Sequence, residues 1–93
     1  MGEYGYTRAD NPNRRVLETA LAALEGGAVG LAFASGQAAT TALLQTLRPG
    51  DHVLAGVDGY WATLVLMREV FGAWGIELST ADLTDPEAVQ AAI

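Results

Sequence analysis

The stretch Gly30-Leu-Ala-Phe-Ala-Ser-Gly-Gln-Ala-Ala-Thr40 joins a short apolar run to a series of small residues. It predicts a buried strand that ends at Ala34 and a helix that Ser35 caps. Free backbone N–H groups and the positive end of the helix dipole then meet at Ser35, Gly36 and Gln37. This is a favourable place for a phosphate group. An ordinary tight turn with a serine cap would give the same pattern, so both interpretations stay open at this point.

Helix-like and strand-like segments alternate on both sides of this junction. Strands are expected at 29–34, 52–55 and 76–80. Helices are expected from Pro12 to the Gly26-Gly27 pair, from Ser35 to Leu47, over 60–74 and from Pro86 onward. Such alternation predicts an α/β fold in which helix-strand units form part of a parallel sheet.

Finer features of these elements follow from local patterns. Arg48-Pro-Gly-Asp51 is typical of a turn, and Thr84-Asp-Pro-Glu87 resembles a capping box. Side chains expected on the buried faces of the helices are Val16, Leu17, Ala20, Leu21, Leu24, Leu43, Leu44, Leu47, Leu64, Met67, Val70, Phe71 and Trp74. The pattern stops inside the last helix and leaves both sheet edges open, so we expect the chain to be a piece of a longer protein.

Composition excludes several classes of function. The net charge is −6 and the arginines are scattered, which argues against a nucleic-acid partner. With no cysteine and one histidine, disulfides, thiolate metal sites and a histidine metal cluster are excluded. No apolar run approaches the ~20 residues of a membrane span, and the first residues lack the regions of a signal peptide. We therefore expect a cytoplasmic protein without metal or membrane partners.

Three side chains outside the junction are candidates for ligand binding. Tyr6 and Arg8 are two residues apart in a polar arm, so in extended structure both would reach one anion. A solvated arm is the alternative. Tyr60 follows the second expected strand, where parallel sheets bind ligands and an aromatic ring can stack on a planar group. A ring that fills a surface groove is its alternative. His52, Asp58 and Asp82 fit structural or turn roles better.

Together these residues resemble one family. Tyr6-x-Arg8, Asn11-Pro12-x-Arg14 and Leu17-Glu18 are followed by Leu24-Glu25-Gly26-Gly27 and Ala32-Phe33-Ala34-Ser35-Gly36. Pro49-Gly50-Asp51-His52-Val53, Tyr60 and Gly75-Ile76 complete the series. The ordered set is similar to the Cys/Met-metabolism group of pyridoxal-phosphate enzymes, which includes cystathionine γ-synthase, cystathionine lyases and methionine γ-lyase. It covers essentially the whole chain.

The resemblance implies a fold and a division of roles. The chain would be part of the large domain of a fold type I enzyme, with an extended arm at 1–10 and a partial cofactor-binding α/β domain at 11–93. Ser35, Gly36 and Gln37 would bind the phosphate of pyridoxal 5′-phosphate, and Tyr60 would stack on its ring. Tyr6 and Arg8 would reach the phosphate of a neighbouring subunit, which implies a homodimer or homotetramer. Gln37 stands where the family commonly has methionine, a change that a backbone role tolerates. Trp61-Ala62 stands where the family usually has Gly-Gly, and the loop before Tyr60 is one residue shorter.

The chain contains no lysine, because all five of its basic residues are arginines. The family's Schiff-base lysine and the aspartate that pairs with the pyridine nitrogen are both absent. We therefore expect a half-site of a transsulfuration enzyme that acts on a sulfur amino acid, with no catalytic residue and no catalysis of its own. Two alternatives are a small non-catalytic α/β module that binds a phosphate ligand or a partner chain, and a degenerate fragment that folds poorly.

Overall fold

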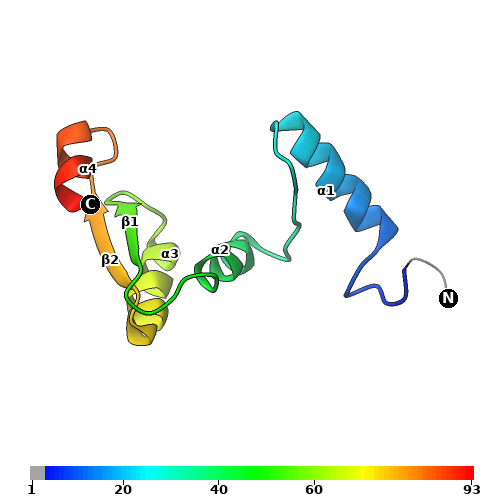
Figure 1. Cartoon of the computed structure of the whole chain (residues 1–93), viewed down its shortest axis with the longest axis horizontal. Coiled ribbons are helices and arrows are strands. Elements are labelled where there is room, and N and C mark those ends of the chain that lie inside the picture. Colours follow the sequence, from blue (N-terminus) through cyan, green and yellow to red (C-terminus); the bar gives the residue numbers. More distant parts are fainter. Residues whose placement is uncertain (1–3) are drawn as a thin grey trace. The chain divides into compact units, whose positions relative to one another are not determined.

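The computed structural model describes residues 4–93, which form two compact units. The first unit ends at Ala34, and its described part contains helix α1. The second unit begins at Ser35 and contains a sheet of two strands, β1 and β2, together with several helices (Figure 1). The first three residues of the predicted arm lie outside the described residues, and the division of the chain at residue 10 stays a prediction.

Helix α1 runs over Pro12–Leu24 and begins as the sequence predicts. The Asn11 side chain accepts hydrogen bonds from the N–H groups of Asn13 and Arg14, and Pro12 is the first helical residue. After the helix, Gly26 adopts a φ of 69°, the left-handed conformation that favours glycine. The predicted apolar face of α1 is not buried in this chain, and its exposed side chains are Val16, Leu17, Leu21 and Leu24.

The strand predicted at 29–34 does not form. Within the described residues, this segment pairs with no neighbouring strand, and the side chains of Val29 and Leu31 are 75% and 71% exposed. A strand needs a partner for its backbone N–H and C=O groups, which an apolar sequence cannot supply by itself. The segment is apolar, as a buried strand requires, but the prediction that this chain buries it as a strand was wrong.

The second unit has the predicted parallel α/β organisation. Strand β1 covers His52–Gly56 and strand β2 covers Glu77–Ala81, with His52 opposite Glu77 in the register. Each strand extends one residue beyond its predicted end, and β2 also begins one residue late. Between α2, which covers Gly36–Leu44, and β1, the predicted turn forms with Gly50 at a φ of 92°.

The single helix predicted over 60–74 is divided into three pieces. Helix α3 covers Trp61–Val65, a π-helical segment follows over Leu66–Phe71, and a 3₁₀ turn covers Gly72–Trp74. Tyr60 precedes the first helical residue, and Gly75 ends the last turn with a φ of 87°. Gly75 was predicted to end the helix expected over 60–74, and this prediction is confirmed.

Helix α4 covers Pro86–Ala92, and Figure 1 shows it beside β2. Its N-cap is Asp85, which lies within the helix start predicted at 84–87, and the Asp85 carboxylate accepts from the N–H groups of Glu87 and Ala88. Pro86 is the first helical residue, as predicted. Among residues 4–93, no helix is both long enough and apolar enough to cross a membrane.

The core of the second unit is small and centres on Phe71, which is 1% exposed. Leu44 and Ile76 pack with it. The Trp74 and Phe71 rings pack edge to face, with their centroids 4.9 Å apart. Leu43 was predicted to be buried beside Leu44, but it is exposed. Consecutive helical residues point about 100° apart, so only one of the two leucines can face the core.

Candidate functional site

The start of helix α2 presents two unused backbone donors. Ser35 is the N-cap, and its Oγ accepts from the N–H of Ala38 at 3.0 Å. The N–H groups of Gly36 and Gln37 have no acceptor within residues 4–93. These two donors lie at the positive end of a nine-residue helix, an arrangement that favours an anion.

Gly36 leaves open space in front of these donors. A Cβ atom placed on Gly36 would meet no other part of the chain within 4 Å, and its φ lies outside the left-handed region. Neither steric contact within the fold nor backbone strain therefore requires glycine here. The space that a side chain would fill is available to a bound group.

A pocket of about 400 Å³ opens at this helix start. It brings together Ser35, Gly36, Gln37 and Tyr60, four of the six residues that the sequence predicted for a cofactor site. The volume falls in the range of small-molecule sites, roughly 300–1,000 Å³. The Tyr60 side chain is 72% exposed, so its ring is accessible to a planar ligand.

Sequence reasoning missed two further residues of this pocket. Thr40 and Thr63 also line it, and the Thr63 hydroxyl donates to Oε1 of Gln37 at 3.3 Å. This contact ties α3 to the first turn of α2. Thr40 is four residues after Gly36 and Thr63 three after Tyr60, so helical spacing could have indicated both.

Tyr6 and Arg8, the other two predicted site residues, lie together in the first unit. The Arg8 guanidinium is 5.2 Å from the centre of the Tyr6 ring, within cation–π range. They meet through a turn, in which the N–H groups of Ala9 and Asp10 donate to the Tyr6 carbonyl, rather than through extended backbone. Their relation to the pocket of the second unit stays a prediction.

The remaining polar candidates have local structural roles. His52 Nε2 lies 2.8 Å from Ser79 Oγ on the neighbouring strand. Asp82 accepts from both the hydroxyl and the N–H of Thr84, and these two hydrogen bonds lower the pKa of its carboxyl group. Within residues 4–93, no group of three His, Cys, Asp or Glu side chains could hold a metal ion.

Comparison with known proteins identifies the family of this arrangement. The profile of the Cys/Met metabolism PLP-dependent enzymes matches residues 1–93, the whole chain. The chain belongs to this family. The curated relatives include a probable cystathionine gamma-synthase of Herpetosiphon aurantiacus, 48% identical over 97% of this chain and 28% of the relative. Cystathionine beta-lyase MetC of Bacillus subtilis is 44% identical over 100% of this chain and 24% of its own length.

A solved structure gives the same result for the fold. The crystal structure of metB from Corynebacterium glutamicum matches with a TM-score of 0.93 and 48% identity, over 98% of this chain and 24% of that one. The chain therefore spans about a quarter of the length of the Cys/Met metabolism enzymes that it matches, and its α/β fold is that of the matching part of the solved structure.

The family's cofactor is pyridoxal 5′-phosphate, and the residues present fit it. Two unused N–H groups and an open glycine suit the phosphate, and an accessible tyrosine ring faces the same pocket. No charged side chain lines the pocket, so backbone N–H groups and the helix dipole would have to supply any attraction for an anion. The chain has no lysine, so no side-chain amine within these 93 residues could bind the cofactor covalently.

Proposed function

We propose that this chain forms the phosphate-binding and ring-stacking half-site of a pyridoxal-phosphate-dependent enzyme of sulfur amino-acid metabolism. The observation that supports it is the single pocket shared by Ser35, Gly36, Gln37 and Tyr60. The first three residues would hold the phosphate through backbone N–H groups and the Ser35 hydroxyl. The Tyr60 ring would stack on the pyridine ring and hold its plane.

The complete enzyme would eliminate or replace a group at the γ or β carbon of a substrate such as cystathionine. Bound pyridoxal phosphate supplies an electron sink that makes the α-proton of an amino acid acidic. Gly36 and Gln37 orient that ring system by fixing its phosphate at one end. Family members named for synthase and lyase reactions match this chain almost equally well, so the half-site serves the chemistry that these reactions share.

Tyr6 and Arg8 would complete the phosphate site of a neighbouring subunit, so the enzyme would be a homodimer or homotetramer. A guanidinium group pairs with phosphate through two parallel hydrogen bonds, and the Tyr6 hydroxyl adds a third donor. This arm would supply the positive charge that the pocket lining lacks. A cytoplasmic location for the enzyme stays a prediction from the sequence.

Ligand binding by the isolated chain tests this proposal. Pyridoxine 5′-phosphate is a suitable probe because it has no aldehyde to react with the N-terminal amine. We expect it to bind more tightly than pyridoxine, with both affinities measured by calorimetry. Gly36→Ala should weaken its binding about tenfold, because the new methyl group enters the space before the two donors. The same samples, given pyridoxal phosphate and cystathionine, should show no turnover.

Gly72→Ala is the matched control, because its Cβ would lie 3.7 Å from the Met67 carbonyl oxygen, an ordinary contact outside the pocket. It should bind the probe like the wild-type chain. Equal affinity for the phosphorylated and unphosphorylated probes would contradict the phosphate site. A Gly36→Ala chain with full affinity would contradict the assigned donors.

A further inference from the structure

One arginine at the start of α1 holds the turn that carries Arg8. Nη2 of Arg14 donates to the Ala9 carbonyl oxygen at 2.9 Å. Its Nη1 lies 3.4 Å from the carbonyl oxygens of both Thr7 and Arg8. A guanidinium group has five N–H donors in a rigid plane, so it can serve three consecutive carbonyl groups at once. A lysine ammonium group lacks this fixed geometry.

A carboxylate one helical turn later connects the same arginine to a second segment. Oε1 of Glu18 lies 3.7 Å from Nε of Arg14. The same oxygen accepts from the backbone N–H of Ala32 at 2.8 Å. Only 17% of the Glu18 side chain is exposed, which strengthens both contacts relative to a surface pair. The Glu18 carboxylate thus links α1 to the residues that lead directly into Ser35.

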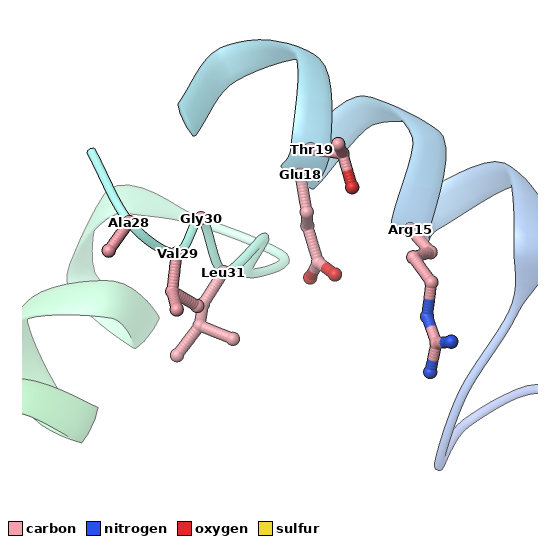
Figure 2. A pocket seen from close by; sticks show the side chains of 7 residues that line it. All are labelled: Arg15, Glu18, Thr19, Ala28, Val29, Gly30 and Leu31. Atoms are coloured by element: carbon pink, nitrogen blue, oxygen red, sulfur yellow. The ribbon is translucent and has the colours of Figure 1, made fainter. Parts of the chain in front are cut away.

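Close packing at Gly30 fixes this second segment against the helix. A Cβ atom on Gly30 would collide with the backbone oxygen of Glu18, so no larger residue fits without movement. Figure 2 shows Glu18 extending from α1 toward the segment that contains Gly30, beside a pocket of about 270 Å³. Glu18 therefore contacts this segment in two ways, through its backbone oxygen at Gly30 and through its carboxylate at Ala32.

We propose that Arg14 and Glu18 are positioning residues for the cofactor phosphate. Arg14 holds the arm that presents Tyr6 and Arg8, and Glu18 holds the segment that continues into Ser35 and Gly36. Their ion pair joins these two tasks within the first unit. The inference rests on the proposed function for its purpose, while the contacts themselves are independent of any ligand.

Amide hydrogen exchange of the whole chain tests the contacts directly. In Arg14→Ala, the amides of Ala9 and Asp10, which donate to Tyr6, should exchange about tenfold faster. Arg14→Lys keeps the charge and loses the planar fork, so it should behave like Arg14→Ala. Arg68→Ala removes an equal charge from the second unit and should leave these amides unchanged.

The Glu18 variants separate hydrogen bonding from charge. Glu18→Gln keeps an acceptor oxygen, so the Ala32 amide should stay protected, whereas Glu18→Ala should expose it. Full protection of Ala9 and Asp10 in Arg14→Lys would overturn the proposed fork and leave only a charge effect. Unchanged exchange at Ala32 in Glu18→Ala would overturn the role of the carboxylate.

Binding of pyridoxine 5′-phosphate to the same variants then tests the purpose of the contacts. In samples that sedimentation shows to be dimeric, Arg14→Ala and Glu18→Ala should weaken binding of the phosphorylated probe and leave binding of pyridoxine unchanged, because the arm would act on the site of the neighbouring subunit. Faster exchange with unchanged binding would overturn the positioning role. A wild-type chain that does not prefer the phosphorylated probe would contradict the proposed function instead, so the two failures are distinguishable.

Discussion

The two units of this chain are held together by different kinds of interaction. All the residues buried in the described structure belong to the second unit, where Phe71, Leu44 and Ile76 form a core. The described part of the first unit has no buried residue, and hydrogen bonds and ion pairs of Asn11, Arg14 and Glu18 hold it in shape.

The sequences of the two units do not predict this difference in burial. Helix α1 carries a regular apolar face, and residues 29–34 are as apolar as either strand that forms. Apolar residues contribute to stability only when a partner removes them from water, at about 25 cal/mol per Å² of buried apolar area. The first unit has apolar residues that could form a core, but its described part offers no apolar surface for them to pack against. Polar contacts therefore determine its shape.

The largest difference between the units should appear when a large apolar side chain is removed from each. Phe71→Ala should lower the free energy of unfolding by about 3–5 kcal/mol, because it empties the centre of the core. Leu24→Ala, at a position that is 80% exposed, should change it by less than about 0.5 kcal/mol. Urea denaturation followed by far-UV circular dichroism suits this test, since helices of both units contribute to the signal, whereas Trp61 and Trp74 both lie in the second unit. Similar losses in both variants would contradict the contrast between the units.

A smaller effect is expected from Gly30→Ala in the first unit. The added methyl group collides with the Glu18 backbone oxygen, and such overpacking typically costs about 1–3 kcal/mol. The segment should move away from α1, which faster exchange of the Ala32 amide would reveal. Gly27→Ala, whose Cβ would lie at an ordinary 3.7 Å from the Ala22 oxygen, is the control. An Ala32 amide with wild-type protection in Gly30→Ala would show that the segment is not fixed there.

The smallest expected effect concerns Asp82, an exposed carboxylate of the second unit. Its hydrogen bonds from Thr84 lower its pKa below the ordinary value of 3.8, so the folded state favours the ionised form. The resulting stabilisation is complete above pH 3.8 and is lost as the pH falls through the lower, folded-state pKa. Thr84→Val removes the hydroxyl donor and should raise the Asp82 pKa toward its ordinary value, measured by NMR titration. An unchanged pKa would show that the hydroxyl bond does not stabilise the carboxylate.

Most of the candidate site was predictable because its signals are local. Ser35 caps α2 as predicted, since a serine before a run of small residues satisfies N–H groups only three residues away. Gly36 and Gln37 were predicted as site residues because they directly follow that cap. Tyr60 was predicted because it follows the end of the second expected strand. The hydrogen bond from Thr63 to Gln37, by contrast, joins residues 26 positions apart in the sequence, so no local pattern indicates that contact.

The sequence by itself determined where several elements begin and end. Asn11, Ser35 and Gly75 act through hydrogen bonds or backbone angles within a few residues, so their roles do not depend on distant parts of the chain.

Only the tertiary structure decided which apolar residues are buried. It exposes Val29, Leu31 and Phe33 of the 29–34 segment and buries Leu44 in preference to Leu43. It also places Arg14 and Glu18 between two segments that flank α1. Burial and long-range hydrogen bonds need a partner residue from a distant part of the chain. A local sequence pattern identifies one residue of such a contact and not its partner.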